Sequence, residues 1–287
     1  MELQQTQIII QDDFDLEKIT SCGQCFRVKK FDDETYRFIT DHHILYIRHL
    51  KGGQYLVSCT PAEWHGIWKK YFDLTRNYKS LRMNSGSRNE FICKAMEYGC
   101  GLRVLRQDPW EMLITFIISQ RKNIPAISKS VEKLAEKYGT PVSTARETVC
   151  LFPTPEQLGL ASIEDLAECQ LGYRAAYIRD AVDKVLSGTL DLNAIAEYED
   201  ERHFQELLQV HGVGKKVANC VCLFGSGRSA MVPVDIWISR VIQEECKGQD
   251  PFPLFGKNAG IMQQYAFYYE KNFRFRMDKA AKCPAES

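Results

Sequence analysis

The 287-residue sequence has no feature that would place it in a membrane or outside the cell. No apolar run approaches the ~20 residues that a membrane-spanning helix needs. The first residues, Met-Glu-Leu-Gln-Gln-Thr-Gln, have neither the basic start nor the apolar stretch of a signal peptide. We therefore expect an intracellular protein with no membrane partner, located in the cytoplasm or nucleoid of a prokaryote or in the nucleus of a eukaryote.

An excess of charge of either sign is also missing, because 37 basic residues balance 37 acidic ones. This argues against a protein that coats long stretches of nucleic acid, which would be basic overall. Positive charge is concentrated locally instead. Between Val210 and Val234 the chain carries Lys215, Lys216 and Arg228 and no acidic residue. The pattern favours a confined anion site in a neutral protein.

The eleven cysteines do not form a recognisable disulfide or metal pattern. Their number is odd and they are scattered, which is untypical of a disulfide framework. Cys22 and Cys25 have the C-x-x-C spacing of a redox motif or of half a zinc site, but no second pair completes such a site. We interpret both as packing residues; a thiol-redox enzyme built on them is a distant alternative.

The first part of the chain is rich in β-forming residues. Turn-forming clusters at 32–33 and 52–53 separate short β-rich stretches, which predicts an antiparallel sheet. The expected strands are Ile8–Ile10, Cys25–Val28, Thr35–Thr40, His43–Arg48 and Tyr55–Cys59, with helical segments near Phe14–Ile19 and Pro61–Tyr71.

From about residue 87 the spacing of apolar residues becomes helical. We expect a helix opened by Pro109 with Asp108 as its N-cap, a second helix over 124–138, and capping boxes at Thr154 and Ser162. The predicted fold class is α+β, with an N-terminal β-rich domain over 1–86 and a mainly helical body over 87–287.

The most informative stretch is 204–224, F-Q-E-L-L-Q-V-H-G-V-G-K-K-V-A-N-C-V-C-L-F. The pattern predicts a helix that ends near Val210, a tight turn containing Gly212 and Gly214, and a second helix from about Lys215. Glycines in the turn permit a left-handed backbone and close approach of another molecule. The free N–H groups of the second helix then form a site for one phosphate. An ordinary helical corner is the alternative.

Lys216 is the candidate nucleophile. It lies in the first turn of the second helix, where the dipole disfavours a cation by on the order of several tenths of a kcal/mol. A lysine placed there beside a second lysine indicates either a phosphate contact, which suits Lys215, or a reactive amine. Asp235 opens the amphipathic run 236–242. It is either a helix N-cap only, or also a carboxylate directed toward Lys216 that stabilises positive charge.

Five segments, present in one order, resemble the helix-hairpin-helix DNA glycosylase superfamily and, within it, the 8-oxoguanine DNA glycosylases. They are S-C-G-Q-C-F-R at 21–27, L-R-Q-D-P-W-E at 105–111, L-G-Y-R-A-A-Y at 171–177, H-G-V-G-K-K-V-A-N-C at 211–220 and V-P-V-D at 232–235. The resemblance implies a helical glycosylase body with its hairpin at 204–224 and C-terminal helices packing back on it.

The resemblance implies a monomeric base-excision enzyme that acts on double-stranded DNA containing an oxidised purine. The damaged nucleotide is flipped into a pocket. Lys216 attacks the anomeric carbon of its sugar, expels 8-oxoguanine and forms a Schiff base, and β-elimination then cleaves the strand. Asp235 stabilises the oxocarbenium-like transition state. This chemistry requires no metal and no redox cofactor.

The resemblance also implies which residues contact the base and the DNA. The carbonyl of Gly23 accepts the N7 hydrogen that distinguishes 8-oxoguanine from guanine. Cys220 and Phe267 sandwich the base, and Gln263, which lies four residues before Phe267 and so on the same helix face, reads its Watson–Crick edge. The implied DNA-binding residues are Gly212, Val213, Gly214 and Lys215 in the hairpin, Asn123, and Tyr173 and Arg174, which enter the gap left in the duplex.

The chain departs from this family at positions that relatives use to contact DNA. Ala126 stands where relatives have an arginine that reads the opposite cytosine, and Trp237 where they have a histidine near the phosphate. We therefore expect a relaxed preference for the opposite base and a phosphate contact that is lost or replaced.

Two alternatives remain within the resemblance. A monofunctional or differently specific glycosylase would act on an alkylated base or adenine; such relatives lack the lysine, and many carry a four-cysteine iron–sulfur cluster. Beyond residue 240 this chain has only Cys246 and Cys283, which are too few for one. A non-catalytic DNA-binding protein would be marked by loss of Lys216 or Asp235, and both are present.

Overall fold

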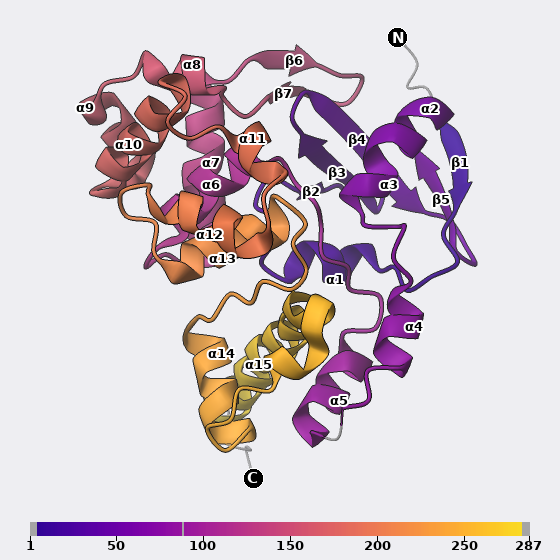
Figure 1. Ribbon diagram of the computed structural model, residues 1–287. Helices are drawn as coiled ribbons and strands as arrows, with labels where there is room; N and C mark the ends of the chain where they lie inside the picture. The colour runs from indigo at the N-terminus through magenta and orange to yellow at the C-terminus, as the bar shows by residue number, and fades with distance from the viewer. Residues whose placement is uncertain (1–4, 88, 283–287) are drawn as a thin grey trace.

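The computed structural model describes residues 5–87 and 89–282 and has the α+β fold that the sequence predicts (Figure 1). An antiparallel sheet is formed by the N-terminal part of the chain, and helices dominate the rest. The strands are β1 (Thr6–Ile9), β2 (Lys29–Lys30), β3 (Thr35–Thr40), β4 (His43–His49), β5 (Gln54–Val57), and a separate hairpin of β6 (Pro141–Ser143) and β7 (Thr148–Cys150).

The five-stranded sheet has the order β1-β5-β4-β3-β2, with every pair antiparallel. Thr40 pairs with His43, so a two-residue turn joins β3 to β4, and Asp41 in that turn has a left-handed φ of 50°. Four of the five predicted strands are confirmed within one or two residues.

The predicted strand Cys25–Val28 is wrong, because this segment passes between two cores instead of pairing. Cys25 packs in the core beneath the sheet, whereas the adjacent Phe26 packs in the core of the helical body. The Arg27 guanidinium donates to the carbonyl of Cys150 and to Glu132, on separate elements. Because these side chains are used in contacts with three different parts of the protein, the segment does not pair with a neighbouring strand. Strand pairing begins at β2.

The helices of the described chain begin at α1 (Leu16–Ser21), α2 (Pro61–Glu63) and α3 (Lys69–Tyr71), the last two joined by a π-helical turn. They continue with α4 (Tyr78–Met83), α5 (Glu90–Tyr98), α6 (Pro109–Ser119), α7 (Ile124–Tyr138), α8 (Pro155–Gly159), α9 (Ile163–Leu166), α10 (Arg174–Leu186), α11 (Leu192–Ala196), α12 (Asp200–Leu208), α13 (Lys215–Phe224), α14 (Ile236–Arg240) and α15 (Ala259–Lys282).

The predicted helix starts are confirmed by the capping bonds. Asp108 accepts from the N–H of Glu111 at the start of α6. Thr154 and Ser162 both form complete capping boxes, opening α8 and α9. These short-range signals placed the helix starts because a cap is satisfied by neighbours only three residues away.

The buried apolar residues form two clusters. One lies between the sheet, α1 and the α2–α3 segment, and the other fills the helical body and reaches α5 and α15. In Figure 1 α15 lies beside α5 at the bottom of the view, and these two helices are in contact. The C-terminal helix therefore packs against a helix from the first third of the chain. The expected domain boundary near residue 87 stays a prediction.

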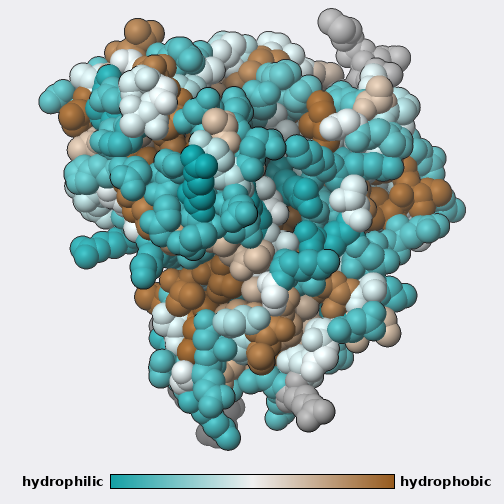
Figure 2. All heavy atoms as spheres, viewed as in Figure 1, coloured by the Kyte–Doolittle hydropathy of each residue, from teal (hydrophilic) through white to brown (hydrophobic). Residues whose placement is uncertain are grey.

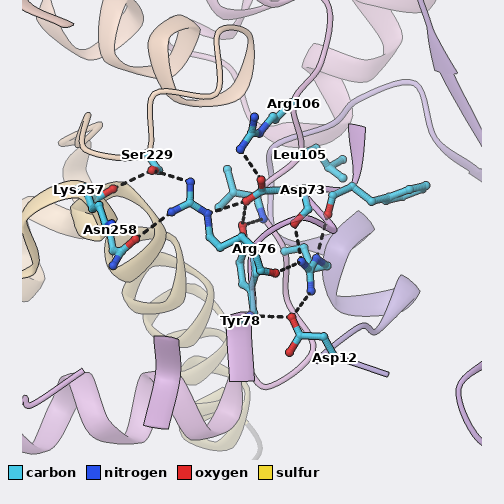
Figure 3. A network of polar contacts seen from close by, with 12 residues as sticks. Asp12, Asp73, Arg76, Tyr78, Leu105, Arg106, Ser229, Lys257 and Asn258 are labelled. Atoms are coloured by element: carbon cyan, nitrogen blue, oxygen red, sulfur yellow. Dashed lines mark hydrogen bonds and ion pairs between the residues drawn. The ribbon is translucent and has the colours of Figure 1, made fainter. Parts of the chain in front are cut away.

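A polar network around the buried Asp73 joins the N-terminal part to the C-terminal helices (Figure 3). Arg76 Nε donates to Asp73 at 2.9 Å, and Arg106 bonds the other oxygen of Asp73. The remaining nitrogens of Arg76 donate to Asn258 at 2.9 Å and Ser229 at 3.0 Å. Ser229 lies between α13 and α14, and Asn258 directly precedes α15, so the network holds these three helices against the sheet-bearing part.

Hydrophilic residues cover most of the face shown in Figure 2, and hydrophobic residues gather below the helical body, above α14 and α15. No helix in the described part of the chain is long and apolar enough to cross a membrane.

Glu111 is buried inside α6 and makes the stability of the protein depend on pH. Burial raises the pKa of Glu111 to about 7 because the carboxylate is removed from water. A raised folded-state pKa means that stability is full below the ordinary value of 4.5 and is lost as the pH rises toward about 7.

We expect Glu111→Gln to raise the free energy of unfolding at pH 8 by up to about 3 kcal/mol, the equivalent of this pKa difference. At pH 4 the variant and the wild type should differ little, because glutamine mimics the protonated acid. Urea unfolding of both proteins at the two pH values measures the effect. An equal difference at both pH values would contradict the assignment.

Candidate active site

The predicted hairpin is present: α12 ends at Leu208 and α13 begins at Lys215. Gly212 has a left-handed φ of 80°, and an added Cβ would lie 2.3 Å from the ring of Tyr177. Glycine is therefore required there for both conformation and space. Gly214, in contrast, has φ −94° and open space beside it, so only Gly212 makes the predicted left-handed turn.

Residues outside the hairpin fix its turn. Gln120, the C-cap of α6, donates to the carbonyl of Gly212 at 3.1 Å. Asp180 of α10 accepts from the N–H of His211 at 2.7 Å. Val213 is buried in the helical core. The turn is thus held from three sides, and among the described residues no side chain caps the N-terminus of α13.

Fewer positive side chains are available around the hairpin than the sequence suggests. Arg228 pairs with Asp200 at 2.5 Å and donates to the carbonyl of Tyr198, so its charge is used inside the fold. Lys215 is exposed beside the free N–H groups of α13, whereas Lys216 is half-buried. The site for a phosphate therefore consists of the turn, the helix N-terminus and Lys215.

Lys216 points into the protein over an aromatic floor. Its Nζ lies 5.2 Å from the centre of the Phe116 ring, which stacks on Phe224 at 5.5 Å. Cys220 follows one turn later on α13, and burial raises the pKa of its thiol while Lys216 opposes that shift. The amine is held among apolar groups at the rim of a cavity.

Asp235 caps α14 and also lines the cavity that contains Lys216. One carboxylate oxygen, Oδ1, accepts from the N–H groups of Trp237 at 3.0 Å and Ile238 at 2.9 Å and so caps α14. Burial raises the pKa of Asp235, and the capping bond from Ile238 and the charge of Lys216 oppose the rise. Neither capping bond uses Oδ2, and Asp235 lines the same cavity as Lys216.

This cavity contains about 320 Å³ of empty space when the open solvent at its mouth is included. Its walls come from four separate parts of the chain: the loop after α1, α6, the α13–α14 region and α15. The lining residues are Gly23, Phe116, Lys216, Cys220, Phe224, Pro233, Asp235, Gln263, Gln264 and Phe267. All six residues predicted as catalytic or base-recognising are therefore brought together.

The base-recognition candidates come from three separate parts of the chain. An added Cβ on Gly23 would lie 3.2 Å from the ring of Phe267, so the loop and α15 are in close contact. Gln263 and Phe267 lie one turn apart on α15, as predicted, and Cys220 of α13 is buried and lines the same cavity. The side-chain oxygen of Gln263 is buried without a hydrogen-bond partner among the described residues. Such an atom requires a ligand or water.

Sequence reasoning missed Phe116 and Gln264. Phe116 belongs to a helix that is apolar on every side, so nothing in the sequence separates it from the core. The sequence does mark Gln264, because Gln263 and Gln264 interrupt an otherwise apolar stretch of α15. In the structure both are buried. Adjacent buried amides need partners, which marks them as site residues.

The expected DNA-facing residues divide into two groups. Tyr173 is 51% exposed and packs edge-on against Tyr177, which in turn contacts the ring of His211, so Tyr173 lies beside the hairpin. Asn123 is exposed and caps α7 by accepting from the N–H of Ala126 at 3.0 Å. Both are available at the surface.

Arg174 differs from its predicted placement. It is buried, and its guanidinium donates to the carbonyls of Gln120 and Leu171. Since Gln120 also holds Gly212, Arg174 supports the hairpin from within. A guanidinium provides enough donors to bind several free carbonyls at the end of a helix, which explains why it turns inward.

The structure also places Trp237 and the two cysteines of the C-x-x-C motif. Trp237, where we expect a phosphate contact to be lost or replaced, has the guanidinium of Arg240 5.4 Å above its ring. A cation is thus present near this position. Cys22 and Cys25 are buried, and burial raises the pKa of Cys22 to about 11. A thiol that stays protonated is a poor nucleophile, which disfavours the thiol-redox alternative.

Two families match successive parts of the chain. The 8-oxoguanine DNA glycosylase N-terminal domain matches residues 7–113, and the HhH-GPD superfamily of base excision DNA repair proteins matches residues 114–247. Among solved structures, MBOgg1 in complex with a low-affinity DNA ligand is 33% identical with a TM-score of 0.89, and the match covers 96% of this chain and 98% of that chain.

An 8-oxoguanine glycosylase/lyase of Clostridium acetobutylicum, in complex with DNA, is 30% identical with a TM-score of 0.88, over 95% of this chain and 97% of that chain. The N-glycosylase/DNA lyase of Saccharomyces cerevisiae is 36% identical over 50% of this chain and 42% of its own length. The matched region spans about half the length of such curated relatives.

The fold, the hairpin and these matches define a base excision DNA repair protein of the HhH-GPD superfamily. Within that superfamily, the chain belongs to the 8-oxoguanine DNA glycosylase family.

Proposed function

We propose that this protein excises 8-oxoguanine from double-stranded DNA and then cleaves the strand through a lysine Schiff base. The observation that carries the proposal is the single cavity in which Lys216 and Asp235 meet Gly23, Cys220 and the two predicted recognition residues of α15. The likeness to glycosylase/lyases along nearly the whole chain supports the same reaction.

In the proposed reaction, the turn at Gly212 and the N-terminus of α13 bind a backbone phosphate, and the damaged nucleotide is flipped into the cavity. The uncharged amine of Lys216 attacks the anomeric carbon, forming a C–N bond as the bond to the base breaks. Asp235 stabilises the positive charge that develops on the sugar. Loss of a sugar proton from the Schiff base then releases the 3′ strand by β-elimination.

Base recognition in this scheme uses residues of α13, α15 and the loop after α1. Cys220 and Phe267 contact the faces of the base, and Gln263, whose buried oxygen has no partner among the described residues, bonds the Watson–Crick edge. The Gly23 carbonyl accepts the N7 hydrogen of 8-oxoguanine. We further propose that the enzyme acts as a monomer with double-stranded DNA as its partner.

Excision assays on three duplexes test the proposal. Otherwise identical duplexes carry 8-oxoguanine, an alkylated adenine, or an adenine mismatch, and released base and cleaved strand are measured separately. We expect release and cleavage only with 8-oxoguanine. Release of an alkylated base or of adenine, without strand cleavage, would instead identify a monofunctional glycosylase. DNA binding without release of any base would identify a non-catalytic DNA-binding protein.

We predict a weak preference for the base opposite the lesion. Ala126 has no side-chain donor, and Arg174 is buried behind Gln120. A bidentate arginine–base contact contributes about 1–3 kcal/mol of discrimination, so its loss should reduce selectivity to less than about tenfold. Single-turnover rates with cytosine, adenine, guanine and thymine opposite 8-oxoguanine measure this. Strong cytosine selectivity would defeat the inference from Ala126.

A further inference from the structure

The loop after α1 contributes one glycine, Gly23, to the wall of the cavity. Gly23 lines the cavity with a left-handed φ of 78°. A glycine in this region rotates more easily than any other residue, so nothing within Gly23 itself determines where its carbonyl points. The orientation must therefore be fixed by its neighbours.

Side chains from distant segments bind the carbonyls on both sides of Gly23. Lys271 Nζ donates to the carbonyl of Ser21 at 3.0 Å, and Gln264 Nε2 donates to that of Cys22 at 2.8 Å. Gln107 Nε2 donates to the carbonyl of Gln24 at 2.8 Å.

In the run 21–24, Gly23 is thus the residue whose carbonyl receives no donor from the described part of the chain. The side chain of Gln24 adds a further restraint by bonding the backbone of Arg103 and Leu105, both at 2.7 Å. The loop is held on each side of one free acceptor.

We propose that Gln264 and Lys271, together with Gln107, are positioning residues for lesion specificity that hold the Gly23 carbonyl toward the flipped base. This inference rests on the proposed function. We call these three side chains the carbonyl clamp.

The clamp would allow the Gly23 carbonyl to distinguish 8-oxoguanine from guanine. The N7 of 8-oxoguanine carries a hydrogen and attracts an acceptor, whereas the N7 of guanine is itself an acceptor and is repelled. A carbonyl that rotates away loses the attraction and the repulsion together. Only a rigid acceptor therefore distinguishes the two bases.

The clamp also connects the loop that contains Gly23 to α15. Gln264 and Lys271 belong to α15, the helix that carries Gln263 and Phe267. The carbonyl of Gly23 is therefore placed relative to the helix that contacts the base, across 242 residues of sequence in the case of the Gln264–Cys22 bond.

Removal of single donors tests the proposal on the full chain. Lys271→Met and Gln264→Met keep side-chain length and remove the donor, and Lys271→Arg restores a cationic donor. Gln205→Met, on the exposed face of α12, is the matched control. Single-turnover excision of 8-oxoguanine is compared with β-elimination at a preformed abasic site in the same duplex, because an abasic site has no base for Gly23 to read.

We expect each Met variant at the clamp to lower 8-oxoguanine excision about tenfold, the effect of one hydrogen bond, and to lower abasic-site cleavage much less. Lys271→Arg should recover most of the excision rate, and Gln205→Met should behave as wild type. Guanine excision, relative to 8-oxoguanine excision, should rise in the Met variants.

Equal losses of excision and abasic-site cleavage would overturn the proposal, since they would indicate a structural role only. Unchanged excision in a folded Lys271→Met variant would overturn it as well. If Gln264→Met does not fold, the Lys271 pair decides the question. Failure of the proposed function is distinguishable, because wild-type protein would then not release 8-oxoguanine at all.

Discussion

Lys216→Gln should abolish covalent trapping by borohydride on a duplex containing 8-oxoguanine. The Schiff base requires a primary amine, and glutamine has none, so no reducible imine forms. We expect base release to fall at least about a thousandfold, as expected when a nucleophile is removed. Denaturing electrophoresis of the borohydride reaction measures the adduct, and reversed-phase chromatography measures the released base.

The change is well suited to the site. Lys216 is half-buried over Phe116 and forms no ion pair with the residues that the structure describes, so the variant should fold and bind DNA. Lys215→Gln is the matched control, because the neighbouring lysine is exposed and should trap normally with weaker and less salt-dependent binding. Absence of an adduct with wild-type protein, while base release is intact, would mean that Lys216 is not the nucleophile.

Asp235→Asn should lower base release by about 10²–10⁴-fold while leaving the fold intact. Asparagine caps helices as well as aspartate, so the bonds to Trp237 and Ile238 are retained and only the charge is lost. Asp235→Ala removes the charge and the cap together and should destabilise the protein by about 1 kcal/mol more than Asp235→Asn. Single-turnover rates and thermal unfolding separate the two effects.

The pH dependence provides an independent check. Because burial raises the pKa of Asp235, the carboxylate becomes protonated at a higher pH than an exposed aspartate would. The rate of base release should therefore fall as the pH decreases through that raised pKa, and Asp235→Asn should lack this acidic limb. A full rate in Asp235→Asn, with the limb unchanged, would show that Asp235 serves only as the cap of α14.

Local features of the fold were predictable because each depends on neighbours in sequence. The caps at Asp108, Thr154 and Ser162 use donors three residues away, and the α12–α13 hairpin follows from apolar spacing and the glycine turn. The strand predicted at 25–28 was wrong because its conformation depends on residues that are distant in the sequence. Its β-forming residues are distributed between two cores, and that choice is made by segments far away in the chain.

The sequence by itself determined the α+β class, the hairpin, and the candidate pair Lys216 and Asp235. Only the tertiary structure decided that these two share a cavity with Gly23, that Arg174 turns inward, and that Gln264 holds the recognition loop. The physical reason is range: helix periodicity and caps act over a few residues, whereas the cavity depends on side chains that meet only after the chain has folded.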